Sequence, residues 1–299
     1  MVKQKDFADY FGVEPYEVIA PSEQTRPFVF NSPHSGRIYP EGFLASSRLD
    51  SLSIRASEDY YVDQFFDKVA QFGVPFLKAN FPRAWLDVNR EPYELDPKMF
   101  DAELPSYINR NSIRVAGGLG TIPKIVAEKK DIYHHKLPLC ESLDRIEHLY
   151  RPYHETLRKL IARTHAKFGY SFLVDCHSMP SNVGQGNSAP RPDFIIGDRY
   201  GASADKCLMQ IALLLLNNMG YHAVSNKPYA GGFITEHYGR PRKNLHALQI
   251  EINRGLYIDE QTLELKPSFA GLQSDLQRFS TQFMHYVEHE FSNIQAAAE

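Results

Sequence analysis

Strand-like apolar runs alternate with helical segments along most of the chain, and this alternation limits the possible folds more than any other feature. The apolar run FVF at residues 28–30 ends at a polar loop. A helical pattern over residues 59–73 follows, with apolar side chains three and four residues apart and a glycine at its end. The pattern predicts an α/β fold: a three-layer sandwich with a mixed, mostly parallel sheet and helices on both faces.

Further elements are expected along the rest of the chain. Strands are predicted in VPFLKANF, AWLDVN, YSFLVDCHS, PDFIIGD, YHAVSN and LHALQIEIN. Residues 141–169 predict a long helix or a pair broken near Pro152, and helices are also expected over residues 203–220 and 269–294. Residues 91–136 lack firm periodicity and are rich in Pro, Gly and Asn, which is typical of a functional loop region. We expect one domain spanning residues 1–299.

Composition and charge narrow the classes of function. The formal net charge of −3, from 33 basic and 36 acidic residues, argues against nucleic acid as a partner. The start MVKQKDFADYFG lacks the apolar core of a signal peptide, and the longest apolar run, IALLLL, is too short to span a bilayer. The three cysteines are widely spaced, which favours reduced thiols. We therefore expect a cytoplasmic protein with no membrane partner, whose oligomeric state the sequence leaves open.

Two histidines follow predicted strands. His34 comes just after the strand at residues 28–30, and His177 follows the strand FLVDC at the corresponding place. Ligands of open α/β sheets bind at the carboxyl ends of strands. Asp59, next to Glu58, opens the helix predicted over residues 59–73, and two imidazoles and a carboxylate with one open position make a catalytic zinc site. The alternative is that Asp59 only caps the helix and the histidines bond to loop carbonyls.

A glutamate lies within the apolar strand LHALQIEIN. Leu248, Ile250 and Ile252 alternate with Gln249, Glu251 and Asn253, so the two sets face opposite sides of the sheet. A glutamate in such a run needs a partner. Glu251 is either one half of a structural salt bridge or the general base that takes a proton from a zinc-bound water and passes it to the leaving nitrogen.

Arginines cluster in the segment FPRAWLDVNREPYE. Arg83, Asp87, Asn89 and Arg90 fall within eight residues, and Arg254 follows Glu251 by three. Arginine suits bidentate recognition of carboxylates, so this cluster indicates a small anionic substrate. In that case Arg83 or Arg90 would stabilise an oxyanion, and another arginine would hold a substrate carboxylate. The alternative is that Arg83 or Arg90 is paired internally with Asp87.

Other motifs carry less weight. His285, Glu288 and His289 fit the H-x-x-E-H pattern, but only ten residues follow them, which leaves little room for a downstream ligand. Cys176 lies beside His177 and alternates with apolar residues, as a core thiol would. The glycine-rich stretch GGLGTIPK and the Gly231–Gly232 pair do not match a phosphate loop, and we expect them to be flexible loops near the site.

Seven ordered blocks of the sequence together resemble the N-formylglutamate amidohydrolase (deformylase) family: NSPHSG, EDYYVDQFF, RAWLDVNREPYELD, RPYHETL, VDCHSMPS, PDFIIGDRYG and HALQIEINRGLYIDE. The resemblance runs from about residue 28 to 262. It implies the zinc-carboxypeptidase-like (phosphorylase/hydrolase-like) α/β fold shared with carboxypeptidases and aspartoacylases. It also implies hydrolysis of an N-formyl amino acid to formate and the free amino acid.

The resemblance also implies roles for individual residues. His34 and His177 match the imidazole ligands, Asp59 matches the acidic ligand, with Glu58 as the neighbouring alternative, and Glu251 matches the catalytic carboxylate. The pair Asn89 and Arg90 is similar to the Asn-Arg pair that grips the substrate carboxylate in zinc carboxypeptidases. The carboxypeptidase pattern has its first two ligands three residues apart; in this chain that position is Arg37, so the carboxylate must come from elsewhere.

These expectations combine into one predicted function with alternatives. We expect Zn²⁺, or another divalent metal, bound by His34, Asp59 and His177. The predicted reaction is hydrolysis of a small anionic N-acyl amino acid, N-formyl-L-glutamate above all, as in amino-acid catabolism such as histidine degradation. A deacylase of another N-acyl amino acid or a small-peptide carboxypeptidase would use the same residues. A non-catalytic carboxylate-binding protein on the same fold would have no need of Glu251.

Overall fold

The computed structural model describes residues 12–127, 130–183 and 191–296. Contacts between Cα atoms divide the described chain into two compact units. The first holds residues 12–17, 33–59 and 78–157, and the second holds residues 18–32, 60–77 and 158–296. The expectation of a single domain over residues 1–299 stays a prediction. None of the described helices combines the length and the apolar character that crossing a membrane requires.

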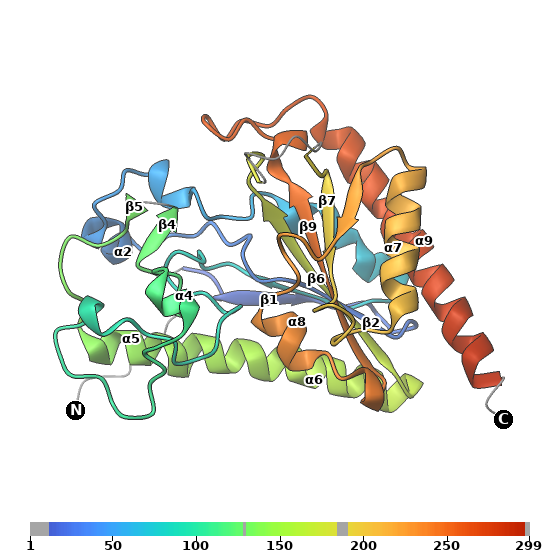
Figure 1. The fold of residues 1–299 in the computed structure, drawn as a ribbon, viewed down its shortest axis with the longest axis horizontal. Helices are drawn as coiled ribbons and strands as arrows, with labels where there is room; N and C mark the ends of the chain where they lie inside the picture. Colours follow the sequence, from blue (N-terminus) through green and yellow to red (C-terminus); the bar gives the residue numbers. More distant parts are fainter. Residues whose placement is uncertain (1–11, 128–129, 184–190, 297–299) are drawn as a thin grey trace. The chain divides into compact units, whose positions relative to one another are not determined.

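Seven strands form one mixed sheet in the order β1-β3-β2-β6-β9-β7-β8 (Figure 1). Strands β2, β6 and β9 run parallel, β7 is antiparallel to β9, and β8 is parallel to β7. This arrangement confirms the α/β fold with a mixed, mostly parallel sheet. The strands are β1 (Tyr16–Ile19), β2 (Phe28–Ser32), β3 (Phe76–Ala79), β6 (Ser171–Met179), β7 (Phe194–Gly197), β8 (Ala223–Ser225) and β9 (Leu245–Asn253).

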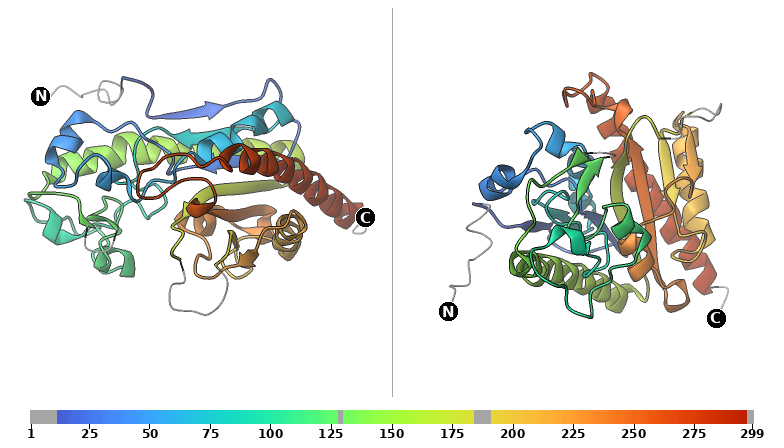
Figure 2. Two further views of the ribbon diagram at one scale, coloured as in Figure 1. Left: turned by 90° about the horizontal axis from the view of Figure 1, so that it is seen from above. Right: turned by 60° about the vertical axis from the view of Figure 1, so that its left-hand side comes forward.

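The core of the second unit lies between one face of this sheet and the helices α3 (Val62–Phe66), α7 (Lys206–Asn218) and α9 (Phe269–Ala296). Alternate residues of the strands, such as Phe172 and Leu248, face these helices and are fully buried. Helix α7 packs against α9 (Figures 1 and 2). On the other face, α8 (Phe233–Tyr238) packs on β9, so helices cover both faces, as the three-layer prediction requires.

The helix predicted over residues 59–73 begins later than expected. The structure has α3 followed by the 3₁₀ segment η2 (Asp67–Phe72), and Gly73 ends it in the left-handed conformation with φ 80°. Tyr61, at φ 57°, is also left-handed and separates the helix from the residues before it. Asp59 therefore precedes the helix instead of capping its first turn.

The strand predicted over AWLDVN is wrong. The backbone N–H groups of Trp85 and Leu86 both donate to the carbonyl of Pro82, at 3.0 and 3.3 Å, which makes a turn. The N–H of Asp87 donates to the carbonyl of Thr121. Because these donors are used by a turn and a loop, none remains for a strand ladder. All six residues of this segment, 84–89, are buried, so the turn carries the same kind of apolar run as a buried strand.

The break expected near Pro152 is a single wide turn. Helix α5 (Leu139–Arg145) passes through the π-helical turn η4 (Ile146–Tyr150) into α6 (Arg151–Phe168). Pro152 is the second residue of α6, so the ring and the missing N–H fall where helix geometry changes. Gly169, at φ 82°, follows the end of the helix as predicted.

The loop region at residues 91–136 contains only short elements where it is described. They are η3 (Pro97–Met99), α4 (Ile113–Ala116), and the antiparallel pair β4 (Ile125–Ala127) and β5 (Lys130–Asp131). The other short elements of the first unit are α2 (Glu41–Ser46) and η1 (Ser53–Arg55).

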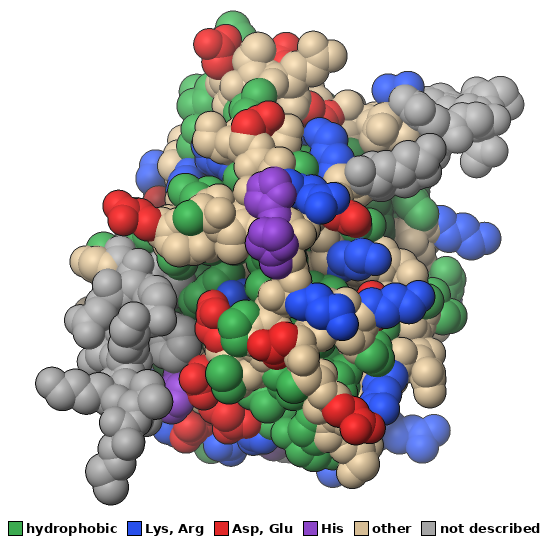
Figure 3. Space-filling model, turned by 90° about the vertical axis from the view of Figure 1, so that its left-hand side faces the viewer, with side chains coloured by type: hydrophobic (Ala, Val, Ile, Leu, Met, Phe, Trp, Pro, Cys, Tyr) green, Lys and Arg blue, Asp and Glu red, His purple; other side chains and the backbone are tan. Residues whose placement is uncertain are grey.

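On the face shown in Figure 3, acidic and basic side chains are interspersed, and two histidine side chains lie next to one another.

One buried histidine makes stability depend on pH. His246, 4% exposed, packs against the rings of Phe172 and Phe291, and its Nδ1 accepts a hydrogen bond from the N–H of Asp205 at 3.1 Å. Burial lowers the pKa of His246 from 6.5 to about 4. The unfolded state therefore takes up a proton at higher pH than the folded state does. His246 lowers the stability of the fold as the pH falls from 6.5 toward 4, and it has no such effect above pH 6.5.

We expect His246→Asn to weaken this pH dependence. The Asn oxygen can accept the same backbone hydrogen bond, but it does not titrate. A shift of this size corresponds to at most about 3 kcal/mol of unfolding free energy. Urea unfolding at pH 7.5 and 4.5 measures it: the wild type should lose up to about 3 kcal/mol more than the variant on acidification. Equal losses in both proteins would show that His246 is not the buried titrating group.

Candidate active site

The second unit lines up polar residues on the face of the sheet opposite the α7 and α9 core. In the register of the parallel strands, Asn31 of β2 is the neighbour of Asp175 on β6. His177 of β6 is the neighbour of Glu251 on β9. Neighbouring strands lie about 4.8 Å apart, so paired side chains project side by side from the same face. The predicted alternation along β9 is confirmed, since Leu248, Ile250 and Ile252 belong to the opposite, apolar core.

A chain of hydrogen bonds orients His177. The side-chain N–H of Asn31 donates to Asp175 Oδ1 at 2.7 Å, and Asp175 Oδ2 lies 2.9 Å from Nε2 of His177. Asp175 is fully buried and His177 is 2% exposed. A carboxylate on one ring nitrogen of a histidine fixes the tautomer and directs the other nitrogen to a metal. In His177 the nitrogen that could bind a metal is therefore Nδ1.

An amide orients Glu251. The Gln249 side chain donates from Nε2 to Oε1 of Glu251 at 2.7 Å, and its own oxygen accepts from the N–H of Gly232 at the same distance. Gly232 comes just before α8, so the expected loop at Gly231–Gly232 lies close to this carboxylate. The donor in this contact is an uncharged amide, which holds the Glu251 carboxylate in place.

The first unit gives His34 the same arrangement as His177. Nε2 of His34 lies 2.7 Å from Asp87 Oδ1, and Nδ1 lies 3.4 Å from Oδ2 of Asp59. The backbone N–H of Asp59 also donates to the carbonyl of His34 at 3.0 Å, which fixes the two residues beside one another. Asp87 is therefore the carboxylate partner of Nε2 in His34, as Asp175 is the carboxylate partner of Nε2 in His177.

The distance between His34 and Asp59 fits two ligands of one metal ion. At 3.4 Å it is longer than a strong hydrogen bond. Two ligands of a tetrahedral zinc, each about 2.0–2.2 Å from the ion, lie about 3.4 Å apart. Among the described residues, the side chains that can hold a metal are the buried His34, Asp59 and His177. Their donor types, nitrogen and oxygen, suit Zn²⁺.

Glu58 does not share the surroundings of Asp59. Arg55 donates to both oxygens of Glu58, at 3.0 and 3.1 Å, and the hydroxyl of Tyr39 donates at 3.1 Å. Burial raises the pKa of Glu58, although Arg55 opposes the shift. With both oxygens engaged by Arg55, Glu58 serves as its counterion. These contacts favour Asp59 over Glu58 as the acidic ligand.

Asp87 is the centre of the arginine cluster. Arg83 donates to Asp87 Oδ2 at 2.8 Å, the guanidinium of Arg90 lies 3.6 Å from the same oxygen, and the N–H of Asn89 donates to Oδ1 at 2.8 Å. Burial alone would raise the pKa of Asp87, but Arg90, His34 and Arg83 outweigh it and hold the pKa well below its ordinary value. The internal pairing of Arg83 with Asp87 is thus present, and a role for Arg83 at an oxyanion stays a prediction.

The other two candidate arginines also donate to uncharged acceptors. Arg90 donates from Nε to the carbonyl of Leu119 and from Nη1 to that of Asn89, both at 2.8 Å. Leu119 belongs to the stretch GGLGTIPK, so this loop does reach the arginine cluster. Arg254, 5% exposed, donates to the hydroxyl of Ser178 at 2.9 Å, next to His177. Their roles in substrate binding stay predictions.

Glu288 of the H-x-x-E-H pattern and Cys176 have structural roles. Glu288 of the H-x-x-E-H pattern pairs with Arg26 at 3.0 Å. Cys176 is fully buried in the core, and burial raises its thiol pKa well above the ordinary value, which favours a packed thiol. The three cysteines are free.

Sequence reasoning did not single out three residues that orient the candidate site: Asn31, Asp175 and Gln249. The signal for two of them was the period of two in a strand. Asp175 precedes His177 by two, and Gln249 precedes Glu251 by two, so each pair shares a face of the sheet. For Asn31 the signal depends on the pairing of β2 with β6, which the sequence does not state.

Comparisons with known proteins point to one family. The family model described as N-formylglutamate amidohydrolase matches residues 26–258. Curated proteins named N-formylglutamate deformylase are 29% identical, from Pseudomonas putida over 78% of this chain and 82% of the relative, and from Pseudomonas aeruginosa over 82% and 87%.

Solved structures are similar as well. A crystal structure of N-formylglutamate amidohydrolase from Ralstonia eutropha JMP134 has a TM-score of 0.88 and 32% identity, covering 93% of this chain and all of the other. The gene product Atu2144 from Agrobacterium tumefaciens, at a TM-score of 0.68 and 18% identity over 97% of this chain and all of the other, shares the fold.

Proposed function

Because the chain belongs to the N-formylglutamate amidohydrolase family, we propose that it hydrolyses N-formyl-L-glutamate to L-glutamate and formate. Membership makes it an amidohydrolase; the substrate is the proposal. The names of the curated relatives and of the Ralstonia structure support it. The structural observation that carries the metal-dependent mechanism is the 3.4 Å separation of His34 Nδ1 and Asp59 Oδ2, with Nε2 of His34 occupied by Asp87.

We infer that His34, Asp59 and His177 hold Zn²⁺. The bound ion would polarise the formyl oxygen and lower the pKa of water to about 7. Glu251, held by Gln249, accepts the proton of the attacking water and delivers it to the leaving nitrogen. Glu251 is suited to this because the amide of Gln249 orients it and because it lies beside His177 in the register of β6 and β9.

The substrate is a dianion, and the arginines supply the matching charge. We propose that Asn89, Arg90 and Arg254 bind its carboxylates, and that Arg83 stabilises the charge that develops on the formyl oxygen. The contact with Asp87 at 2.8 Å fixes the orientation of the Arg83 guanidinium. In this scheme Asp87 has two functions: it orients His34, and it fixes Arg83.

The orienting carboxylate of His177 should matter for metal affinity. We expect Asp175→Asn to weaken zinc binding by about 10- to 100-fold, because the amide no longer holds the imidazole in the required tautomer. Competition with a chromogenic chelator measures the affinity. Asp193→Asn, a change elsewhere in the same unit, is the control and should bind zinc as the wild type does. An unchanged affinity in Asp175→Asn would show that Asp175 does not support the metal.

Two arginines should separate the chemical step from binding. Arg83→Ala should lower kcat by about 10²–10³ if its guanidinium stabilises the oxyanion. Arg254→Ala should mainly raise KM, because a substrate carboxylate is bound equally in the ground state and the transition state. Steady-state kinetics on both variants gives the comparison. If Arg83→Ala raised KM with kcat unchanged, Arg83 would bind a substrate carboxylate and would not stabilise the oxyanion.

A panel of substrates tests the proposed reaction. Formate release from N-formyl-L-glutamate is compared with release from N-formyl-L-methionine, and amine release is measured from N-acetyl-L-glutamate and from a dipeptide with a C-terminal glutamate. We expect the highest kcat/KM for N-formyl-L-glutamate. Preference for N-acetyl-L-glutamate would assign the chain to another N-acyl amino acid, and preference for the dipeptide would make it a carboxypeptidase.

A further inference from the structure

A cationic cavity of about 740 Å³ lies on the second unit. It is lined by the turn after β7, the end of α8 and the short segment η5 (Pro241–Lys243). Four basic side chains, Arg199, Arg240, Arg242 and Lys243, surround it against one acidic side chain, Glu236. The whole chain has a net charge of −3, so this is a local concentration of positive charge. Small-molecule sites have volumes of about 300–1,000 Å³.

The cavity is separate from Glu251. Segment η5 ends at Lys243, just before β9 begins at Leu245, and Glu251 comes six residues further along that strand. Since a strand rises about 3.3 Å per residue, Glu251 lies about 20 Å from the start of β9. The end of the cavity that η5 forms is therefore at the opposite end of β9 from Glu251, and none of the residues that line the cavity belongs to the candidate active site.

The turn that forms one wall is rigidly built. Arg199, Tyr200 and Gly201 are all left-handed, with φ 55°, 56° and 84°. Two consecutive non-glycine residues in this region cost conformational energy and persist only where neighbours hold them. Asp198 accepts hydrogen bonds from the N–H of Gly201 and from the side chain of Asn226, whose oxygen accepts from the N–H of Asp198 in return. Strain held in this way is typical of binding sites.

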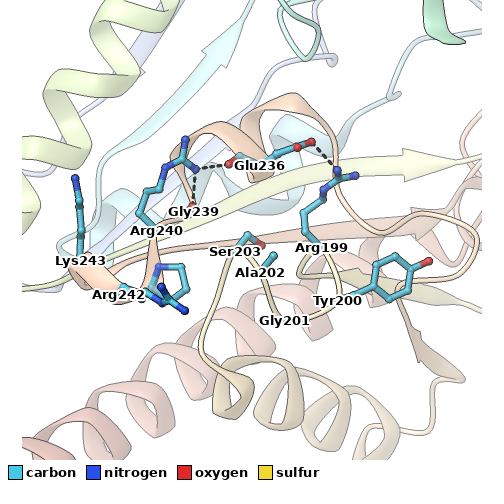
Figure 4. A pocket seen from close by; sticks show the side chains of 11 residues that line it. Arg199, Tyr200, Gly201, Ala202, Ser203, Glu236, Gly239, Arg240, Arg242 and Lys243 are labelled. Carbon is cyan, nitrogen blue, oxygen red and sulfur yellow. Dashed lines mark hydrogen bonds and ion pairs between the residues drawn. The ribbon is translucent and has the colours of Figure 1, made fainter. Parts of the chain in front are cut away.

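Two arginines are fixed beside the cavity. Arg199 pairs with Glu236 at 2.6 Å and donates to the carbonyl of Gly231 at 3.3 Å. Arg240 donates to the carbonyls of Glu236 and Gly239, at 2.6 and 2.7 Å. Figure 4 shows both guanidinium groups reaching toward Glu236. Because each guanidinium has five N–H donors, both arginines keep donors for a ligand, in an orientation that is already set.

The remaining lining side chains supply uncompensated charge and apolar surface. Arg242 and Lys243 are exposed, and within the described ranges neither forms an ion pair. Tyr200, 70% exposed, and the ring of Pro241 also line the cavity. Figure 4 places Tyr200 at the end of the cavity away from Lys243. An exposed aromatic ring beside cations suits a ligand with a planar or apolar part and anionic groups.

We propose that this cavity binds a small organic polyanion with two or more phosphate or carboxylate groups. Arg242 and Lys243 engage the anionic groups at one end, and Arg199 and Arg240 supply oriented donors along the wall. Tyr200 packs against the body of the ligand. This site is independent of the proposed hydrolysis, and its failure would leave the active site unaffected.

The test is calorimetric titration of the full chain with pyrophosphate, ATP and citrate at low salt. The cavity variant is Arg242→Gln combined with Lys243→Gln. The control is Lys68→Gln combined with Arg278→Gln, which removes the same charge elsewhere on the same unit. We expect saturable binding of one ligand per chain for at least one probe, weakened at least about tenfold in the cavity variant and less than about twofold in the control.

The probes also identify the chemistry. Binding of pyrophosphate and ATP without citrate would show a phosphate site; binding of citrate alone would show a carboxylate site; tighter binding of ATP than pyrophosphate, lost in Tyr200→Ala, would show that the ring contributes. The proposal is overturned if no probe binds saturably. It is also overturned if the cavity variant and the control bind equally, because the anion would then bind elsewhere, for example at the active site.

Discussion

Replacing Glu251 by Gln should lower kcat for hydrolysis by about 10²–10⁴ while the protein keeps its metal. The amide has nearly the shape of the carboxylate and can still contact Gln249, whose Nε2 lies 2.7 Å from Oε1 of Glu251 in the unaltered protein. It cannot accept the proton of the attacking water. Glu251 is not assigned to the metal, so zinc content should stay the same. Steady-state kinetics and metal analysis on the same preparation measure both quantities.

The control for this variant is Glu264→Gln, which neutralises an exposed glutamate of the same unit. It should retain full activity. Survival of turnover in Glu251→Gln would assign the proton transfer to another group. If the variant lost both turnover and zinc, Glu251 would be a ligand or a support for the metal, and its assignment as a general base separate from the metal ligands would be wrong.

Removing the carboxylate of Asp59 should abolish zinc binding and lower activity by about 10³ or more. Lewis-acid stabilisation by a metal is worth several kcal/mol, and each 1.36 kcal/mol is about tenfold in rate. Asp59 is fully buried, and its oxygen lies 3.4 Å from Nδ1 of His34. In Asp59→Ala, two imidazoles remain to hold the ion. Zinc content after dialysis and formate release are the measurements, with circular dichroism to confirm that the variant is folded.

Glu58→Gln is the matched control because it changes the adjacent carboxylate. Its contacts go to Arg55 and Tyr39, so its loss should cost stability but leave zinc and turnover in place. The opposite pattern, with zinc lost from Glu58→Gln and kept by Asp59→Ala, would exchange the roles of the two residues. The pair of variants therefore settles which of two neighbouring acids binds the metal.

The sequence was sufficient to predict the two strands that carry His177 and Glu251. Long apolar runs bounded by polar loops place β6 and β9, and the period of two puts His177 and Glu251 on the faces observed. The same reasoning failed for AWLDVN, because a turn that is buried along its whole length carries the same kind of apolar run as a buried strand. What decides between them is the hydrogen bonds of the backbone, in this case to Pro82 and Thr121, which the pattern does not record.

The carboxylates that orient the histidines show a second limit. Asp87 and His34 are 53 residues apart, and their contact at 2.7 Å depends on how the first unit folds. The sequence indicated Asp87 only as a partner for arginine, and that pairing is present together with the contact to His34. The sequence pattern thus revealed one of the two contacts of Asp87, the pairing with arginine, and not the contact with His34. Asp175 is the simpler case, since it lies two residues before the histidine it orients.

The most direct test of the central claim is zinc content of the purified protein together with formate release from N-formyl-L-glutamate before and after chelation. We expect about one zinc per chain, loss of formate release on removal of the metal, and recovery when zinc is restored. Formate release that is unaffected in a protein shown to be free of metal would contradict the claim, because His34, Asp59 and His177 would then not serve the reaction as metal ligands.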